Sequence, residues 1–206
     1  MPHRYPPPPT PEELGLALPG PGPGRRRSGD DLPKLKRFRS QLLAAWIAER
    51  FPPCAVADVG GGKGLLTWLL IEAGFRAEVV DPADQPLPAT YRDLRSGRRV
   101  RLGPDAAVPR RRVAFGPRLG RRYDLLVALH AHGSNLAVLD TAAAAAGSSC
   151  VVLPCCVVDE PAAPGPGQNW FLWLVERARG LGLEPEFFAL NFAGQNLGFV
   201  VRGRRP

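Results

Sequence analysis

Four glycines within five residues, at positions 60–64, separate two segments whose apolar character predicts β-strands. The strands are predicted over residues 55–59 and 77–80, with an apolar helix over residues 65–73 between them. Because glycine has no Cβ, such a turn adopts positive φ and lets a ligand come close to the backbone. Strand, glycine turn, helix and strand together predict a βαβ unit, which restricts the chain to an α/β fold with parallel strands.

The spacing of the glycines distinguishes between three nucleotide-binding motifs. A P-loop requires Ser or Thr after its lysine, where this chain has Gly64. A dinucleotide fingerprint, counted from the first or the third glycine, requires a further glycine where the chain has Leu65 or Thr67. The pattern acid-x-Gly-x-Gly-x-Gly fits, beginning at Asp58 and ending at Gly64.

That pattern resembles motif I of the class I S-adenosylmethionine-dependent methyltransferases. The resemblance extends over residues 33–203 and implies an α/β fold with a Rossmann-like, mostly parallel sheet of seven strands, an antiparallel last strand and helices on both faces. It implies S-adenosyl-L-methionine as the cofactor, with Asp58 directed towards its methionine part. Asp81 ends the second predicted strand, where a carboxylate binds ribose hydroxyls. The predicted cofactor-binding residues are Asp58, Gly60, Gly61, Gly62, Lys63, Gly64, Asp81 and His130.

The sequence divides into a tail and one domain. Residues 1–29 are dominated by Pro and Gly, a composition that cannot bury a core, and they are predicted to form a disordered or polyproline tail. The domain is predicted over residues 30–206, a length that is ample for a hydrophobic core. Its first helix is predicted from Asp31, a candidate cap, to Phe51, which precedes two prolines.

After Asp81 the pattern of apolar residues weakens. A short helix is predicted over residues 91–96, whereas residues 99–102 and 112–115 are alternative candidates for the third strand, or pair with each other as a hairpin. Asp105 is the one candidate for the acid that the family places after its third strand. Clearer signals then predict strands over residues 124–129, 150–153, 186–191 and 197–201, and helices over residues 136–146 and 169–179.

Titratable and soft side chains follow two of these predicted strands. Ligands of an open α/β sheet bind beyond the carboxyl ends of the strands, so these side chains are expected to share one cleft with the glycine turn. The candidate catalytic residues are His130, His132, Asn135, Cys155 and Cys156. In one interpretation a histidine is the general base that deprotonates the methyl acceptor. In another, a cysteine attacks C6 of a pyrimidine, as in RNA 5-methylcytosine methyltransferases.

Two further interpretations of the same residues stay open. Two histidines and two cysteines are zinc-ligating types, but the adjacent cysteines lack the usual gap of two to four residues, so no metal site is predicted. Alternatively, the cysteines are small core residues at a strand end. The histidine turn also resembles that of the tRNA 2′-O-methyltransferases that modify the acceptor stem, where it reads roughly His-Leu-Cys-Gly. This chain has His-Ala-His-Gly at positions 130–133.

The charge of the chain is concentrated in one segment. The formal net charge is +8, and Arg95 to Arg122 contains ten arginines but a single acid. Such a patch is typical of nucleic-acid binding, and RNA is predicted as a partner. The alternative is a solvated loop in an arginine-rich proteome.

No apolar run is long enough to span a membrane and no apolar signal core is present, so a cytoplasmic location is predicted. The four cysteines do not resemble a disulfide framework, and the sequence leaves the oligomeric state open. The function predicted from the sequence is methylation of RNA, either tRNA or rRNA, by S-adenosyl-L-methionine. The alternatives are methylation of a small molecule or a protein, and a non-catalytic domain that binds RNA or a partner.

Overall fold

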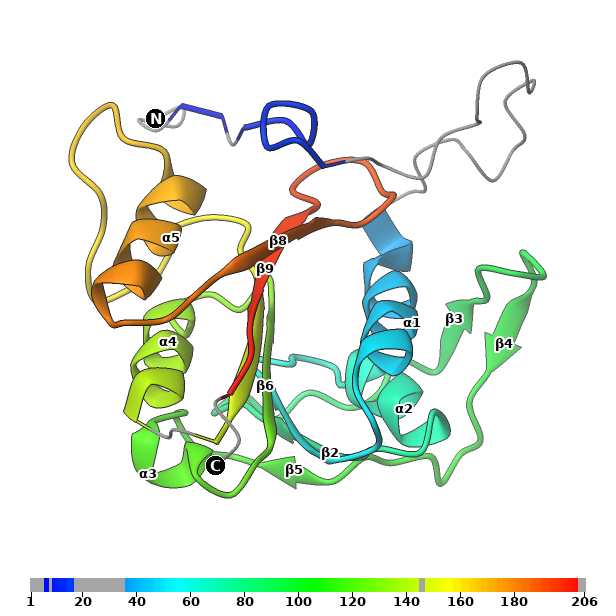
Figure 1. The fold of residues 1–206 in the computed structure, drawn as a ribbon. Coiled ribbons are helices and arrows are strands. Elements are labelled where there is room, and N and C mark those ends of the chain that lie inside the picture. Colours follow the sequence, from blue (N-terminus) through cyan, green and yellow to red (C-terminus); the bar gives the residue numbers. More distant parts are fainter. Residues whose placement is uncertain (1–5, 8, 17–35, 145–146, 204–206) are drawn as a thin grey trace, which may run out of the picture.

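Seven strands form one sheet in the order β5-β2-β1-β6-β7-β9-β8 in the computed structural model, which describes residues 6–7, 9–16, 36–144 and 147–203 (Figure 1). The strands are β1 (Ala55–Val59), β2 (Arg76–Val80), β5 (Arg110–Arg111), β6 (Leu125–Leu129), β7 (Ser149–Leu153), β8 (Glu186–Ala189) and β9 (Leu197–Val201). Within this sheet β9 alone runs opposite to the other six strands. This arrangement confirms the predicted fold class.

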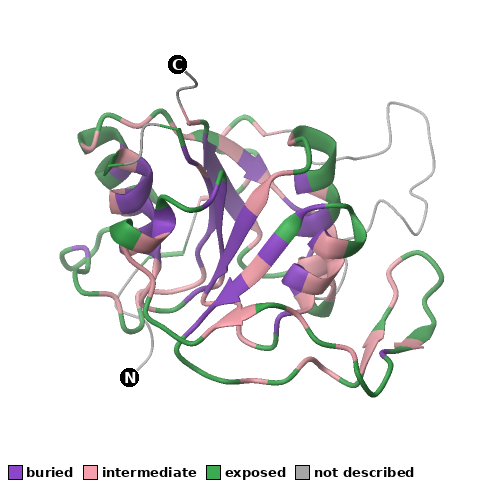
Figure 2. Cartoon of the chain, turned by 90° about the horizontal axis from the view of Figure 1, so that it is seen from below, coloured by how far each residue is buried: buried purple, intermediate pink, exposed green. Residues whose placement is uncertain are grey.

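The central strands are buried because each contributes apolar side chains to both faces of the sheet (Figure 2). Alternate residues of β6 divide between two cores: Leu125 and Val127 face one, Leu126 and Ala128 the other. Continuous apolar runs of this kind are typical of parallel strands covered on both sides.

Helices cover both faces of the sheet (Figure 1). On one face lie α1 (Arg39–Arg50) and α2 (Leu65–Glu72), with a 3-10 turn, η1 (Lys36–Phe38), before α1. The other face carries α4 (Asn135–Ala144), α5 (Trp170–Gly180) and the short α3 (Pro117–Gly120). The predicted start of the first helix at Asp31 lies outside the described residues.

The strand order reverses between β1 and β6, which are hydrogen-bonded neighbours. Open α/β sheets bind ligands outside the carboxyl ends of the strands at such a switch point. In Figure 1 these carboxyl ends lie at the upper edge of the sheet, because β9 runs downwards to the C-terminus and β7 is antiparallel to it. The loop between β8 and β9 lies at the same upper edge.

The segment between β2 and β6 differs from its prediction. The third strand of the sheet is β5, which pairs with β2 at Arg110 and Arg111, rather than residues 112–115 or 99–102. Residues 99–101 form β4 (Arg99–Arg101), which pairs with β3 (Thr90–Arg92) in a separate hairpin. The predicted helix over residues 91–96 is wrong, because Asp93 forms a turn that closes this hairpin. Its N–H donates to the carbonyl of Arg98, and its carbonyl accepts from Gly97, whose φ is 65°.

Part of the predicted N-terminal tail contacts the domain. Leu14 and Leu16 pack against the core on the α4 and α5 side, and the side-chain amide of Asn169 donates to the carbonyls of Pro6 and Pro7. The rest of residues 1–29 lies outside the described part, so the tail and the domain boundary stay predictions. No helix in the described ranges is long and apolar enough to cross a membrane.

Candidate functional site

The glycine turn joins β1 to α2 in the conformation that the sequence motif requires. Gly60, Gly62 and Gly64 have φ values of 62°, 52° and 80°, a region that side chains with a Cβ rarely adopt. Close packing fixes two of them: a Cβ on Gly60 would lie 2.9 Å from Cβ of Ala131, and one on Gly64 would lie 2.9 Å from Cγ2 of Val108. At Gly62 the nearest atom is 4.0 Å away, so the backbone there stays open to a ligand.

Asp58 lies beneath the turn as a support. Its side chain is 1% exposed, and its Oδ2 accepts a hydrogen bond of 2.7 Å from Oγ1 of Thr67 in α2. A Cβ on Gly61 would lie 2.6 Å from the Asp58 carboxyl, so glycine is also required there. Burial raises the pKa of Asp58 to about 6, because desolvation disfavours the charged carboxylate.

Asp81 binds the turn from the end of β2. Its Oδ2 accepts a hydrogen bond of 2.9 Å from the N–H of Gly62, and its Oδ1 accepts one of 2.8 Å from Ala83. Each carboxylate oxygen keeps a lone pair for a ligand hydroxyl. The predicted acids of β1 and β2 therefore lie at one turn, Asp58 below it and Asp81 beside it.

Sequence reasoning missed the specific role of Arg110. Its Nη1 donates to the carbonyl of Gly62 over 2.9 Å and to that of Ala83 over 3.4 Å. A Cβ on Gly64 would lie 3.4 Å from its Nη2. The sequence indicates only that Arg110 belongs to a basic segment, because no local pattern links it to a turn 48 residues earlier.

Two other residues predicted around the cofactor lie apart from the buried network. Lys63 is exposed at the tip of the turn. Asp105 lies before β5, so it does not occupy the position after the third strand that its predicted role requires. Arg112 follows β5 instead and pairs with Asp84 at the surface over 2.7 Å.

His130 ends β6 and connects it to the loop between β8 and β9. Its Nε2 lies 3.0 Å from the carbonyl oxygen of Gln195, and its φ of 52° turns the chain away from the strand. Burial lowers the pKa of His130 to about 4 because desolvation disfavours the imidazolium. A neutral imidazole with so low a pKa is a weak base, so the structure favours a positioning role for His130.

His132 lies beside both strand-end cysteines. Its Nε2 is 3.2 Å from Sγ of Cys155 and 3.3 Å from Sγ of Cys156, and the two sulfurs are 3.5 Å apart. These three predicted residues therefore form one cluster, which we call the His-Cys-Cys cluster. Burial and the Cys156 thiol raise the pKa of Cys155 to about 12, which disfavours a ready thiolate nucleophile.

Asn135 is buried below the turn, at 1% exposure, and begins α4. Its side-chain Nδ2 donates to the carbonyl of Ala131 and to Oε1 of Glu160, and its backbone N–H donates to Glu160 as well. The structure thus shows that Asn135 supports the turn that carries His132, and its catalytic role stays a prediction. Glu160 was not predicted, because the contact joins residues 25 positions apart.

The glycine turn and the turn after β6 lie against each other. The hypothetical Cβ of Gly60 is 2.9 Å from Cβ of Ala131 and 3.8 Å from Oγ of Ser134, both in the turn after β6. That turn carries His130 and His132. The glycine turn is therefore adjacent to the turn in which candidate catalytic residues lie.

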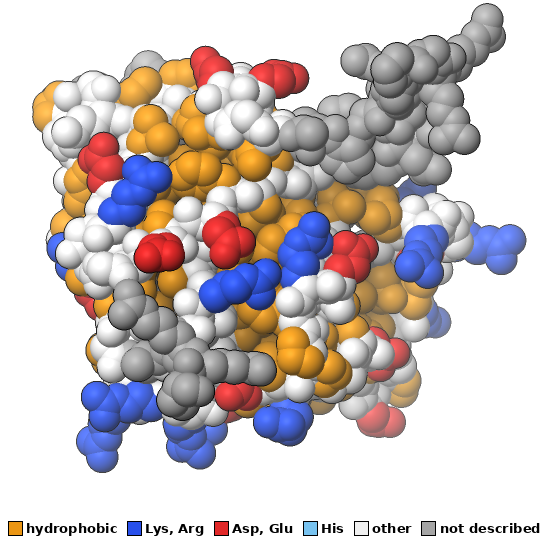
Figure 3. Space-filling view, in the orientation of Figure 1, with side chains coloured by type: hydrophobic (Ala, Val, Ile, Leu, Met, Phe, Trp, Pro, Cys, Tyr) orange, Lys and Arg blue, Asp and Glu red, His pale blue; other side chains and the backbone are white. Residues whose placement is uncertain are grey.

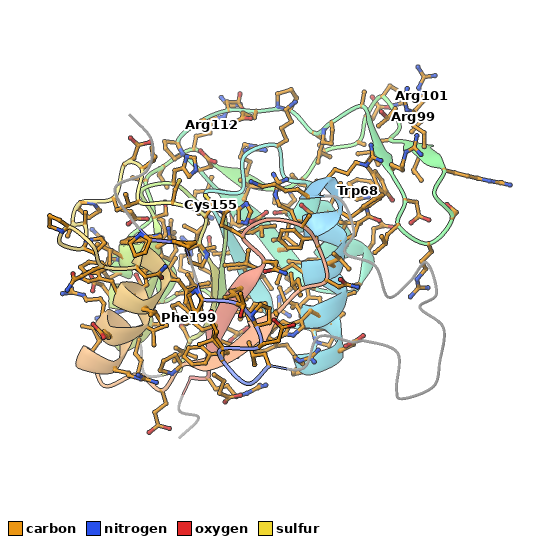
Figure 4. All side chains as sticks on the ribbon, turned by 90° about the horizontal axis from the view of Figure 1, so that it is seen from above. Trp68, Arg99, Arg101, Arg112, Cys155 and Phe199 are labelled. Atoms are coloured by element: carbon orange, nitrogen blue, oxygen red, sulfur yellow. The ribbon has the colours of Figure 1, made fainter. Side chains whose placement is uncertain are left out.

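The predicted basic segment divides into three parts. Arg110 and Arg111 make internal contacts, with the carbonyl of Gly62 and with Glu78. The β3–β4 hairpin, which we call the basic hairpin, carries four exposed arginines of the segment together with Arg92, which precedes the segment. The five are Arg92, Arg95, Arg98, Arg99 and Arg101. The basic hairpin lies at the right of Figure 1, and blue side chains project at the right-hand edge of Figure 3, which has the same orientation. Figure 4 shows that Arg99 and Arg101 lie away from Cys155. The other exposed arginines of the segment are Arg112, which follows β5, and Arg118, Arg121 and Arg122, which lie around α3.

Comparisons with known proteins support the fold. No protein-family model matches the sequence, and no curated protein matches it. The structure is similar to that of Burkholderia thailandensis 1,6-didemethyltoxoflavin-N1-methyltransferase with bound 1,6-didemethyltoxoflavin and S-adenosylhomocysteine (TM-score 0.50, 16% identity, 82% of this chain and 80% of that one). It is also similar to the apo form of the S-adenosylmethionine-dependent methyltransferase SibL (TM-score 0.50, 16% identity, 81% and 55%). These similarities establish the Rossmann-like methyltransferase fold; the resemblance to tRNA enzymes stays a prediction.

Proposed function

We propose that the protein is an S-adenosyl-L-methionine-dependent methyltransferase. The observation that carries the proposal is the glycine turn at the switch point of the sheet, with three positive-φ glycines, Asp58 beneath them and Asp81 hydrogen-bonded to Gly62. Glycines, an acid at the end of the next strand and the start of a helix are the parts with which such folds bind a nucleoside. Asp81 would accept the ribose hydroxyls, and the backbone of Gly62 would line the approach of the cofactor.

The cofactor would supply an electrophilic methyl group on a sulfonium. This chain's own residues would bind and orient it at the glycine turn and place the acceptor against the turn that carries His132. His130 would hold that turn to the β8–β9 loop through the carbonyl of Gln195. Asn135 and Glu160 would fix it from below.

Calorimetry with S-adenosyl-L-methionine tests the proposal on a matched pair of variants. Gly62→Ala places a methyl group where the backbone is open to a ligand. Gly74→Ala is the control, because Gly74 also has positive φ, at 91°, and its Cβ would lie 3.8 Å from the nearest atom. Both changes strain the backbone, by about 1 kcal/mol or more, but only Gly62→Ala is expected to weaken binding, by about tenfold or more. No binding by the unaltered chain would reject the enzyme and leave a partner-binding domain.

We further propose that the methyl acceptor is RNA. The basic hairpin supports this, since it carries five exposed arginines and Asp93 as its one acid. Gln41 holds the hairpin in place: its Nε2 donates to the carbonyl of Arg92 over 2.8 Å, and its Oε1 accepts from Leu94 over 2.7 Å. A positioned group of guanidinium side chains binds phosphates and makes affinity dependent on salt.

The salt dependence of tRNA binding tests the RNA proposal. A triple change of Arg95, Arg99 and Arg101 to Gln is expected to reduce the slope of log K against log salt by about 2. The control changes Arg118, Arg121 and Arg122 to Gln, which removes the same charge near α3. Equal losses from both triples would mean that only total charge matters. No tRNA or rRNA binding by the unaltered chain would favour a small-molecule or protein acceptor instead.

A further inference from the structure

We propose that the His-Cys-Cys cluster is a zinc site with three protein ligands and one open coordination position. Its ligands are Nε2 of His132, Sγ of Cys155 and Sγ of Cys156. These atoms can hold a metal ion together, as they lie within 4.8 Å of one another. The sequence predicts no metal site, because the adjacent cysteines lack the usual gap of two to four residues. The fold nevertheless brings ligands from two neighbouring strand ends to one point.

The geometry of the cluster fits a zinc ion. With Zn–S bonds of about 2.3 Å and Zn–N bonds of about 2.05 Å, a tetrahedral ion separates nitrogen from sulfur by about 3.6 Å and sulfur from sulfur by about 3.8 Å. The observed separations are 3.2 and 3.3 Å for nitrogen to sulfur and 3.5 Å for sulfur to sulfur. Zinc binding therefore requires each pair to separate by only about 0.3–0.4 Å.

The two segments that carry the ligands, the turn after β6 and the segment after β7, are hydrogen-bonded to each other. The N–H of Gly133 donates to the carbonyl of Val158 over 3.0 Å. Glu160 accepts hydrogen bonds from the backbone N–H groups of Asn135 and Leu136 over 2.9 and 3.2 Å. A Cβ on Gly133 would lie 2.8 Å from the carbonyl oxygen of Asp159, so the two segments are in direct contact. These hydrogen bonds hold His132 opposite the cysteines in the absence of a metal. They therefore lower the free-energy cost of ordering the ligands when zinc binds.

Three protein ligands and an open position are typical of catalytic zinc, whereas structural zinc is closed by four. His132 is exposed and both cysteines are half-buried, so the fourth position is accessible from solvent. The same turn packs on Gly60 through Ala131. In the methyltransferase proposed above, on which this role depends, the ion would bind the acceptor's nucleophilic atom and lower its pKa.

Metal binding by the full chain tests the site independently of methyl transfer. We expect the reduced protein to compete for one equivalent of Zn²⁺ with a chromophoric chelator. Cys155→Ser, Cys156→Ser and His132→Ala are each expected to weaken binding at least about 100-fold, beyond the usual effect of losing an outer-shell partner. Cys54→Ser is the matched control and is expected to bind like the unaltered chain, since Cys54 lies outside the cluster. Undiminished binding by the three cluster variants would overturn the proposal.

Cobalt substitution needs no variant and covers the case in which a variant fails to fold. Co²⁺ bound by two thiolates in a tetrahedral site is expected to give a thiolate-to-cobalt charge-transfer band and intense visible bands. A spectrum of octahedral, oxygen-ligated Co²⁺ would overturn the site. Calorimetry with S-adenosyl-L-methionine on the chelated protein separates the two proposals: cofactor binding without metal binding rejects the zinc site alone, and the reverse rejects the proposed function alone.

Discussion

The N–H of Gly62 donates a hydrogen bond to Oδ2 of Asp81 over 2.9 Å, so the glycine turn is attached to the end of the neighbouring strand. A second hydrogen bond of 2.9 Å, from the N–H of Gly60 to the carbonyl of Val80, connects the turn to the last residue of β2. The turn is therefore organised before any ligand arrives, which reduces the ordering cost of binding.

Arg110 is expected to contribute to cofactor binding by holding this turn. Arg110→Met removes the hydrogen bonds to the carbonyls of Gly62 and Ala83 but retains an apolar stem. Charged hydrogen bonds are worth about 1.5–3 kcal/mol, so a loss of S-adenosyl-L-methionine affinity of about tenfold is expected by calorimetry. Arg112→Met is the control, because Arg112 pairs with Asp84 at the surface, where ion pairs contribute little. Equal affinity in both variants would contradict this role.

Asp58 is expected to make stability depend on pH. Its pKa is raised by burial from 3.8 to about 6 in the folded chain, so the folded state binds more protons than the unfolded state between these values. The contribution of Asp58 to the free energy of unfolding is therefore greatest below pH 3.8, and it is lost as the pH rises through 6. Asp58→Asn is expected to be more stable than the unaltered chain by about 1–3 kcal/mol at pH 8, with no such difference near pH 3.5.

Urea unfolding of the cofactor-free protein across that pH range measures the difference. Asp140→Asn serves as the control, because Asp140 lies at the surface in an ion pair with Arg177. A gain for Asp58→Asn that grew as the pH fell would contradict the assigned sign.

Glu160 is expected to stabilise the start of α4. Glu160→Ala removes the acceptor for the N–H groups of Asn135 and Leu136 and leaves the buried Asn135 amide with one partner fewer. A loss of about 2–4 kcal/mol in the free energy of unfolding is expected, with a smaller loss for Glu160→Gln, which retains one acceptor oxygen. Glu176→Ala, an exposed change on α5, is expected to fall within about 0.5 kcal/mol of the unaltered chain. Indistinguishable stabilities for the two alanine variants would refute the role.

Gly120 is expected to tolerate no side chain, because the neighbouring residues leave no room for a Cβ. A Cβ there would lie 2.1 Å from Cγ2 of Thr141 and 3.1 Å from the ring of Phe115, which would force α3 away from α4. Gly120→Ala is expected to lower the free energy of unfolding by about 1–3 kcal/mol, the usual range for overpacking. Gly116→Ala is the control, since a Cβ at Gly116 would meet no atom within 4 Å. Thermal unfolding of both variants measures the difference, and similar midpoints would count against close packing.

The sequence predicted those elements that have a strong local signal. The βαβ unit was recognised because its strands are continuous apolar runs and its turn consists of glycines. The helix predicted over residues 169–179 also has a local signal, because Asn169 precedes α5 and its Oδ1 accepts from Leu172. By contrast, β5 consists of Arg110 and Arg111, and its pairing depends on main-chain hydrogen bonds, such as the one from Val79 to the carbonyl of Pro109. No side-chain pattern in the sequence indicates such a strand.

The sequence predicted only part of the candidate site. The rule that ligands bind at strand ends placed His132 and the two cysteines together, and the structure brings them within 3.5 Å of each other. Arg110 and Glu160 could not be assigned in that way. Their partners are far away in the sequence, and only the folded chain shows which carbonyl or N–H group each one reaches.

The position of β9 has a consequence for how the protein is made. This strand follows all other described elements in the chain, yet it lies between β7 and β8 with all five residues buried. While a ribosome is still synthesising the chain, β7 therefore exposes an unpaired apolar edge that nothing else in the sheet can cover. Such an edge pairs readily with another chain, so a nascent chain that stalls before residue 197 is expected to aggregate or to recruit chaperones.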